Sequence, residues 1–297
     1  MIACGERFRR ARYNRMHRSV MPATSSVELG SVQKTLLLPL WGRSVETTSA
    51  HPLLVDETAV RIIASLGYDF STIASHISPI TQLSWIARSL HIDRTVREFL
   101  SHHPDATVVN LGCGLDTTFE RVDNGQLIWY DLDLADVIKL RRRFIPESDR
   151  RTFLACSLFD QAWRWQLKAD HSVFFIAAGV LYYFQESQIR ALFSSLADAF
   201  PGSELIFDAT TARGVKMANQ KVIAAGGMDE SAILRWGLER ARDLQTWDAP
   251  ITVLDHYPIF RNLKQGLEFK KQWGMLMADS LRVLSMVHVR LGRSCAP

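Results

Sequence analysis

The sequence predicts an α/β fold in which helices cover both faces of a mostly parallel sheet. Short apolar runs typical of buried strands recur from residue 107 onward, and segments with helical periodicity lie between most of them. Parallel strands need long crossover connections, which are usually helices that pack on the sheet. Hydrophobic residues make up 47% of the 297-residue chain and the mean hydropathy is -0.02, as expected for a soluble globular domain with a large core.

Residues 27–104 are expected to form a helical N-terminal cap on this core. Prolines, a glycine and a Ser/Thr cluster interrupt residues 27–55, which favours apolar turns there over one long helix. Asp56–Leu66 is predicted to be a helix because Asp56 is a suitable N-cap. A longer helix is expected over Pro79–Ser101, where apolar side chains recur at helical spacing.

Residues 105–297 are expected to form the core, with seven apolar runs as its strands. These runs are Thr107–Leu111, Leu127–Leu132, Thr152–Ala155, Ser172–Ala178, Glu204–Phe207, Ile251–Leu254 and Arg282–Val289. Helical patterns between them lie at Leu134–Phe144, Phe159–Leu167, Glu186–Phe200, Arg213–Ala225 and Arg261–Gly274. An insertion near residues 213–248, helical over Met228–Asp248, is expected to help roof a substrate pocket.

Residues 1–26 differ from the rest of the chain in composition. They hold six arginines against one acid, a net charge of +5, whereas the whole chain carries +4. A charged segment with so few apolar residues cannot bury enough area to fold, so a disordered basic leader is predicted. Residues 27–297 then form a single domain with a net charge of about -1, which gives no reason to expect nucleic-acid binding.

Hydropathy and cysteine usage exclude two further classes. The longest apolar run, Val173–Phe184, has about a dozen residues, well short of the ~20 that a membrane-spanning helix needs. The N-terminus has no apolar signal segment, so a cytoplasmic location and no membrane partner are expected. None of the four cysteines forms a C-x-x-C pair, so neither a disulfide framework nor a metal site is expected. These features do not set the oligomeric state.

The segment Thr107–Leu111 runs into Gly112-Cys113-Gly114, and this junction is the strongest functional signal. Glycines at such a turn let the backbone approach a ligand, because a Cβ would collide with it. The next strand ends in Asp131 and Asp133, and an acid there accepts hydrogen bonds from ribose hydroxyls. We expect these two carboxylates to point to opposite sides, so that at most one faces the ligand. Because the third glycine of a dinucleotide fingerprint is missing, an adenosine ligand without pyrophosphate, such as S-adenosylmethionine, is favoured.

Weaker candidates follow other predicted strands. Ser157 and Leu158 follow the third strand, in a loop that would flank an adenine ring, although Ser157 also suits a helix cap. Ala178 ends the fourth strand before a glycine and two tyrosines, a pattern that suits either close approach to a ligand or ordinary packing. Arg88 lies on the helix before the first strand, where its pattern alone is that of a surface residue.

Three segments carry a resemblance to a known family. They are Asn110–Thr118, which reads NLGCGLDTT, Tyr130–Leu134, which reads YDLDL, and Gly179–Phe184, which reads GVLYYF. Over roughly residues 30–290 the chain resembles the leucine carboxyl methyltransferase family, in particular its bacterial and fungal O-methyltransferases associated with polyketide pathways. That family is similar in fold to class I methyltransferases. The resemblance therefore implies a Rossmann-like, seven-stranded sheet and S-adenosylmethionine as the cofactor.

The resemblance also implies roles for individual residues. Arg88 looks like the arginine that holds the cofactor carboxylate, for which a guanidinium fork is suited by geometry. Gly112 looks like the close-approach glycine and Asp133 like the ribose-binding acid. Asp131 stands where the family usually has Glu, and Arg43 matches a basic residue near the methionine part of the cofactor.

Two departures from the family pattern leave an alternative open. Ser157 and Ala178 stand where the family usually has acids, so backbone carbonyls or water would have to replace those contacts. A non-catalytic binding or regulatory protein with the same fold is therefore the main alternative to an enzyme. A nicotinamide-dependent oxidoreductase is a third option, which the incomplete pyrophosphate loop disfavours.

The expected activity is methyl transfer to a carboxylate or hydroxyl of a small molecule, in polyketide or other secondary metabolism. A carboxylate is ionised near neutral pH and needs no general base, whereas a hydroxyl needs one. No residue is assigned as a base, so alignment of the reactants and exclusion of water are expected to drive catalysis. Tyr182 and Tyr183 are candidates to orient the acceptor.

Overall fold

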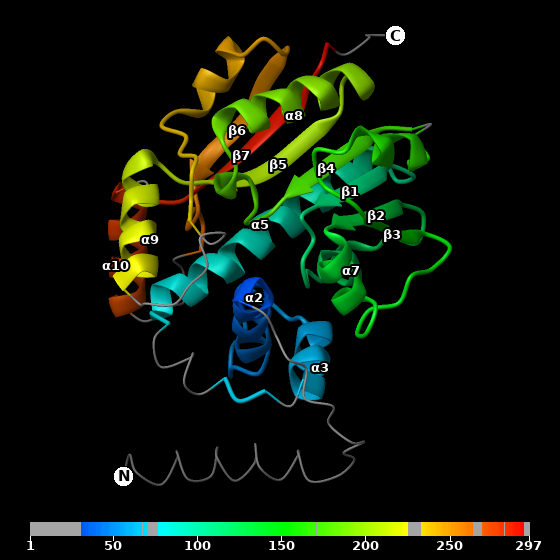
Figure 1. Cartoon of the computed structure of the whole chain (residues 1–297). Coiled ribbons are helices and arrows are strands. Elements are labelled where there is room, and N and C mark those ends of the chain that lie inside the picture. The colour runs from blue at the N-terminus through cyan, green and yellow to red at the C-terminus, as the bar shows by residue number, and fades with distance from the viewer. Residues whose placement is uncertain are drawn as a thin grey trace, which may run out of the picture.

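The computed structural model describes residues 31–66, 68–70, 77–169, 171–224, 233–263, 269–281 and 283–293. A seven-stranded sheet with the order β3-β2-β1-β4-β5-β7-β6 lies at its centre (Figure 1). The strands are β1 (Thr107–Leu111), β2 (Ile128–Asp133), β3 (Arg151–Ala155), β4 (Val173–Ala177), β5 (Glu204–Ala209), β6 (Ile251–Pro258) and β7 (Ser285–Leu291). Within the described residues, β7 alone runs in the direction opposite to the other six strands. The predicted leader, residues 1–26, lies outside this description.

All seven predicted strands are confirmed, and β1 has the predicted bounds. Every residue of β1 and β4 is buried, which is why these central parallel strands read as continuous apolar runs. The edge strand β6 extends past its predicted end to Pro258, with an irregular register between Val253 and Asp255. The apolar pattern did not predict the second half of β6 as strand, because exposed residues, most of them polar, occupy the positions that do not face the core.

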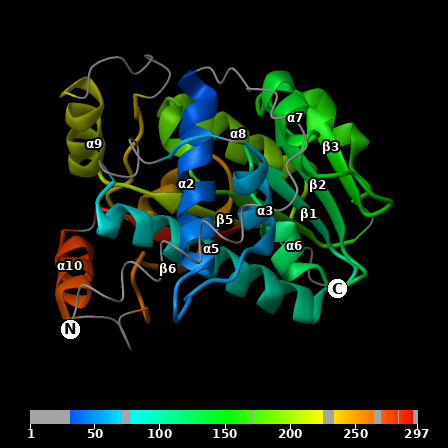
Figure 2. The same cartoon turned by 90° about the horizontal axis from the view of Figure 1, so that it is seen from below.

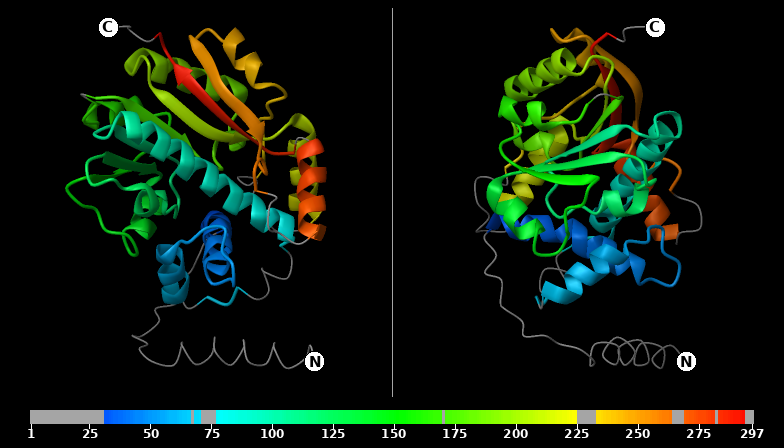
Figure 3. Two further views of the ribbon diagram at one scale, coloured as in Figure 1. Left: turned by 180° about the vertical axis from the view of Figure 1, so that it is seen from behind. Right: turned by 90° about the vertical axis from the view of Figure 1, so that its right-hand side faces the viewer.

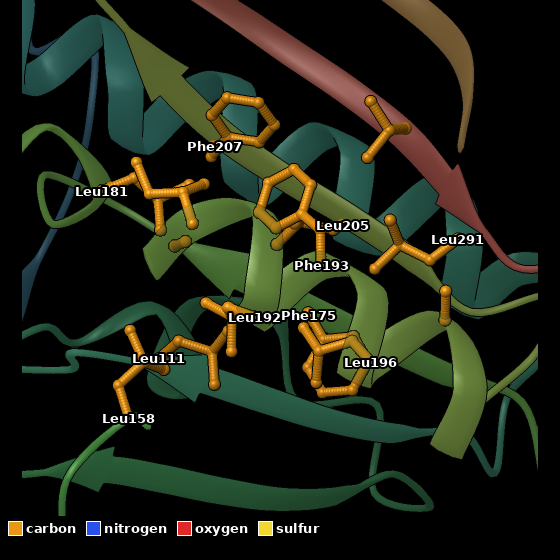
Figure 4. Packing of buried hydrophobic residues seen from close by; sticks show 14 of the residues in the cluster. Leu111, Leu158, Phe175, Leu181, Leu192, Phe193, Leu196, Leu205, Phe207 and Leu291 are labelled. Atoms are coloured by element: carbon orange, nitrogen blue, oxygen red, sulfur yellow. The ribbon is translucent and has the colours of Figure 1, made fainter. Parts of the chain in front are cut away.

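Helices cover both faces of the sheet, as predicted. On one face, α8 (Glu186–Ala199) packs Leu192, Phe193 and Leu196 against the strands, as the close view in Figure 4 shows. On the other face, the long helix α5 (Pro79–His102) crosses the sheet (Figure 3). The other helices within the described residues are α2 (Ser31–Thr47), α3 (Glu57–Leu66), α6 (Thr118–Val122), α7 (Ala135–Arg141), α9 (Ala212–Ala224), α10 (Phe269–Ser280) and three short 3₁₀ helices.

The helical cap is present, but the expectation of turns over residues 27–55 was wrong for much of that segment. Helix α2 includes Pro39 and crosses α5 beside α3 (Figure 2). Leu37 and Leu40 are 1% exposed and pack with Ile62 of α3 and with Leu115, which follows β1. This burial outweighs the cost of an internal proline, which removes only one helical hydrogen bond and bends the axis. The cap therefore packs directly against the glycine segment.

Three other helix predictions were wrong in part. Residues 159–167 form the 3₁₀ helix Gln161–Gln166, and the predicted helix Arg261–Gly274 is instead α10, which starts at Phe269. The predicted helix Met228–Asp248 begins in residues outside the description, continues without helix over 233–238, and includes only the 3₁₀ helix Ala241–Thr246. Trp236 and Trp247 anchor this segment in the core, and the backbone amides of Arg235, Trp236 and Leu238 donate to the loops after β4 and β5.

Candidate functional site

Most of the predicted site residues lie at or just after the carboxyl ends of four parallel strands, β1 to β4, and therefore meet at one edge of the sheet. The register places Leu111 opposite Leu132 and Asp133 opposite Ala155, so the segments after β1, β2 and β3 are neighbours. The chain winds outward in opposite directions from β1 and β4, which lie side by side. Ligands in open α/β sheets bind in the crevice at the carboxyl ends of two such strands.

Gly112 and Gly114 form a tight turn in which a side chain is excluded at both positions. Their φ angles are +66° and +48°, in the left-handed region that favours glycine. A Cβ on Gly112 would lie 2.6 Å from a methyl group of Val180, and one on Gly114 would lie 3.0 Å from Leu36. The Gly112 and Cys113 amides donate to the Leu132 carbonyl oxygen, which fixes the turn against the end of β2.

Asp133 lies beside this turn, as the sequence predicted. Its Oδ2 accepts a 2.7 Å hydrogen bond from the Gly114 amide, and its Oδ1 accepts one of 2.8 Å from the Leu134 amide. Burial raises the pKa of Asp133, although both amide hydrogen bonds oppose that shift. The arrangement places a half-buried carboxylate next to two glycines, against which Val180 and Leu36 pack. A carboxylate at such a turn suits the hydroxyls of a ribose.

Asp131 has a different role from the one predicted. It is 0% exposed, accepts hydrogen bonds from the Trp129 indole (2.9 Å) and Arg151 Nε (2.8 Å), and forms an ion pair with Arg141. Arg141 in turn donates to the Gly114 carbonyl oxygen at 2.9 Å. Asp131 thus supports the glycine turn through Arg141, with both of its carboxylate oxygens turned to protein partners. The expectation that it and Asp133 point to opposite sides was wrong, because side chains two residues apart in a strand point to the same face. The two carboxylates differ instead in burial, since Asp131 is fully buried and Asp133 is half-buried.

Arg88 lies at the same edge, facing the loop after β4. Its Nη1 donates to Asp208 Oδ2 at 3.0 Å and makes a longer contact of 3.5 Å to the Tyr182 hydroxyl. Burial tends to lower the pKa of Arg88, but Asp208 and Tyr182 raise it overall, so the guanidinium stays charged. The side chain of Arg88 is 13% exposed, whereas that of Asp208 is 2% exposed. The arginine is therefore the more accessible member of the pair.

Arg43 is placed in a buried network beneath the glycine turn. Its Nε donates to Asp56 at 2.8 Å, and its Nη2 makes longer contacts to the Leu115 carbonyl and the Thr117 hydroxyl, both 3.4 Å. Asp56 also forms an ion pair with Arg121. Although burial raises the pKa of Asp116, Arg43 and other cations hold it well below its usual range. These contacts make Arg43 a link between the cap and the segment after β1, at the edge of the predicted site.

The weaker candidates also lie at this edge. Ser157 is exposed and its hydroxyl accepts from the Phe159 amide within a turn, whereas Asp160 caps the 3₁₀ helix that follows. Leu158 is buried against the core at the end of β3. Ala178 is half-buried between β4 and Gly179. Sequence reasoning missed Asp208, although an acid within the apolar run of β5 was a signal for it.

Two surface pockets in the described part of the chain do not include the glycine turn in their lining. One, of about 410 Å³, lies between the start of α3, α5 and α6, and the other, of about 550 Å³, lies between β6, α10 and the 3₁₀ helix Ala241–Thr246. The second mixes Glu239, Arg242 and His256 and so shows no preference for ligand charge. The chemistry at the carboxyl edge, and not pocket size, identifies the candidate site.

Comparison with known proteins identifies the family of the chain. The sequence profile described as "Leucine carboxyl methyltransferase" matches residues 37–197. The chain is 29% identical to the tetracenomycin polyketide synthesis O-methyltransferase TcmP of Streptomyces glaucescens over 84% of this chain and 86% of that protein. It is 27% identical to the S-adenosyl-L-methionine-dependent methyltransferase dpfgK of Gibberella zeae over 74% and 80% of the two chains.

Solved structures show the same fold at low sequence identity. A DUF574 family protein from Streptomyces avermitilis superposes with a TM-score of 0.57 at 10% identity, covering 86% of this chain and 96% of that one. A protein from Thermobifida fusca superposes with a TM-score of 0.54 at 15% identity, covering 85% and 94%.

Proposed function

Because this chain belongs to the leucine carboxyl methyltransferase family, we propose that it transfers a methyl group to an oxygen atom of a small molecule. It is an S-adenosylmethionine-dependent methyltransferase with the Rossmann-like class I fold. The relatives do not support the alternatives of a non-catalytic binding protein or a nicotinamide-dependent oxidoreductase. Oxygen as the acceptor atom is supported by TcmP, which is named as an O-methyltransferase of polyketide synthesis and aligns over most of both chains.

The cofactor site proposed here is the carboxyl edge around the glycine turn. The observation that carries it is the contact between Gly114 and Asp133, which joins a side-chain-free backbone to a carboxylate. Gly112 and Gly114 would lie against the adenosine, and Asp133 would accept from the ribose hydroxyls. Arg88 would hold the methionine carboxylate through the nitrogens that Asp208 does not use.

Three further residues complete the proposed site. Ser157 and Leu158 would flank the adenine ring from the end of β3, and Ala178 would border the methionine part. Arg43 and Asp131 would act indirectly, since both are buried in ion pairs that hold the turn and the cap in place. When bound, S-adenosylmethionine supplies an electrophilic methyl group on a sulfonium. The protein's contribution is to align an acceptor oxygen with that group and to exclude water.

The titratable groups at this edge favour an acceptor that is already ionised. Burial raises the pKa of Tyr182 and of Tyr183, so both phenols stay protonated near neutral pH and act as hydrogen-bond donors. Among the described residues, Asp133 and Asp208 already accept backbone or arginine hydrogen bonds. A carboxylate acceptor requires no base. We therefore favour a small-molecule carboxylate over a hydroxyl.

Calorimetric titration and a turnover assay test this proposal together. Wild-type protein is expected to bind S-adenosylmethionine and S-adenosylhomocysteine, and to move a deuterated methyl group from the former onto members of a panel of aromatic and aliphatic carboxylic acids. Mass spectrometry of the products distinguishes methyl esters from ethers. Binding of the cofactor together with methylation of only nitrogen or carbon acceptors would refute the proposed acceptor. Absence of cofactor binding by folded protein would refute the proposed site.

A further inference from the structure

Asp208 is a buried carboxylate that follows an apolar stretch of β5, Leu205–Phe207. It is 2% exposed, and its neighbours in β5, Ile206 and Phe207, are 0% exposed. A carboxylate in such surroundings is costly unless each oxygen has a partner. Oδ1 accepts a 2.6 Å hydrogen bond from the Gly179 amide, and Oδ2 accepts one of 3.0 Å from Arg88 Nη1. Asp208 thus ties the loop after β4 to helix α5.

Gly179 shapes the same contact from its other side. Its φ angle is +72°, and a Cβ there would lie 2.6 Å from Arg88 Nη1 and 3.2 Å from Nη2. The guanidinium therefore rests against backbone that only glycine leaves open. Asp208 and Gly179 together fix both the position and the plane of the Arg88 guanidinium.

The fixed orientation leaves one edge of the guanidinium available. Both hydrogen bonds of Arg88, to Asp208 and to Tyr182, use Nη1. Among the residues that the structure describes, Nε and Nη2 have no hydrogen-bond partner. A guanidinium that is held through Nη1 can donate two parallel hydrogen bonds to a carboxylate from Nε and Nη2.

The register of the sheet places Asp208 beside a position that lacks an expected acid. Ala177 pairs with Phe207, so Ala178 and Asp208 follow side by side at the ends of β4 and β5. The family resemblance predicts a glutamate where Ala178 stands. Asp208 brings a carboxylate to the same corner from the neighbouring strand, with both of its oxygens turned to protein partners.

We propose that Asp208 is a positioning residue, which holds Arg88 so that Nε and Nη2 face the methionine carboxylate of the cofactor. The proposal rests on the cofactor site proposed above and deepens it. Asp208 itself touches no ligand, because its two oxygens are used by Gly179 and Arg88. Its contribution is limited to the amino-acid part of the cofactor, at a distance from the ribose acid Asp133.

Two ligands that differ only at the amino-acid end test this role in the full-length chain. S-adenosylhomocysteine carries the carboxylate, whereas 5′-methylthioadenosine lacks the whole amino-acid part and keeps the adenosine. Asp208→Asn is expected to weaken S-adenosylhomocysteine by about tenfold to a hundredfold, the range for a hydrogen bond to a charged group. Binding of 5′-methylthioadenosine is expected to stay within about twofold, because this ligand has no carboxylate for Arg88 to hold. Local packing damage would instead weaken both ligands. Glu204→Gln, at the opposite end of β5, is the matched control and should leave both affinities unchanged.

A double variant and a conservative variant make the test decisive. Arg88→Gln combined with Asp208→Asn should bind S-adenosylhomocysteine no more weakly than Arg88→Gln alone, since Asp208 acts through Arg88. If Asp208→Asn does not fold, Asp208→Glu keeps the charge, moves it by one methylene group, and should still lose affinity only for S-adenosylhomocysteine. Equal losses for both ligands, additive losses in the double variant, or an unchanged S-adenosylhomocysteine affinity would overturn the proposal. Failure of wild-type protein to bind either ligand would instead overturn the cofactor site itself.

Discussion

The amide of Gly114 donates a 2.7 Å hydrogen bond to Oδ2 of Asp133, which joins the turn after β1 to the end of β2. The two residues belong to separate strands that run parallel and side by side. Their contact brings a backbone without side chains against a carboxylate, which is the combination that an adenosine ligand requires. The predictions below concern this contact and the residues that support it.

Replacing Gly112 tests the need for a side-chain-free turn. Gly112→Ala is expected to lower the free energy of unfolding by about 1–2 kcal/mol from the left-handed φ alone, and further through the contact with Val180. Thermal melting and calorimetric titration with S-adenosylhomocysteine measure the two effects. Adding Val180→Ala should recover part of the stability. A Gly112→Ala variant with wild-type stability and affinity would show that the turn does not constrain the site.

Replacing Asp133 tests the ribose contact. Asp133→Asn is expected to weaken S-adenosylhomocysteine and 5′-methylthioadenosine equally, by about tenfold or more, because both ligands carry the ribose. This pattern differs from the ligand-selective loss expected at Asp208. Asp136→Asn, which changes an exposed acid three positions further on, is the control. Unequal losses for the two ligands would place Asp133 elsewhere on the cofactor.

The buried network around Asp56 predicts a pH-dependent stability. Burial alone would raise the pKa of Asp56, but Arg43 and Arg121 lower it below its ordinary value of 3.8. A carboxyl group with a lowered pKa in the folded state stabilises the protein above the pKa of the unfolded chain, and the effect is lost as the pH falls through the folded pKa.

Asp56→Asn is therefore expected to lower the free energy of unfolding by about 3–5 kcal/mol at pH 7, because it leaves buried arginines without their partner. The difference between wild type and variant should shrink as the pH falls below about 4. Urea denaturation over a pH series measures both quantities. A difference that stays constant down to pH 3 would mean that the pKa of Asp56 is the same in the folded and unfolded states, which contradicts the lowered pKa.

The pH dependence of turnover tests the nature of the acceptor. With a carboxylate acceptor, kcat/KM is expected to be flat between about pH 6 and 9, because the acceptor is ionised and the raised pKa values keep Tyr182 and Tyr183 protonated throughout. Initial rates with the best acceptor measure this profile. A rate that rises about tenfold per pH unit would indicate a hydroxyl acceptor that must lose a proton.

The fold was predictable wherever burial produced a local pattern. The strands and α5 follow from apolar runs and helical spacing, and the junction of Gly112 with its strand is visible over a few residues. Helix α2 was missed because Pro39 suggests an interruption, while the packing of Leu37 and Leu40 that outweighs it involves residues far along the chain. The segment around Trp236 was wrongly predicted to be helical for the same reason, because its backbone hydrogen-bond partners belong to loops that are distant in the sequence.

The site was predictable in its local parts and not in its pairings. Gly112 and Asp133 were found from a motif and a strand end. The partners of Asp131 and Arg88 were not, because a sequence does not show that Asp208, 120 positions from Arg88, comes within 3.0 Å of it. Asp131 is more deeply buried than Asp133, and this difference in burial also depends on which residues pack against the strand.

A crystal structure with S-adenosylhomocysteine tests the central claim most directly. The ribose hydroxyls are expected on Asp133, the adenosine against Gly112 and Gly114, and the methionine carboxylate on Nε and Nη2 of Arg88. A ligand bound with its ribose away from Asp133, or a glycine turn still covered by Val180 and Leu36 at saturating ligand, would contradict the account.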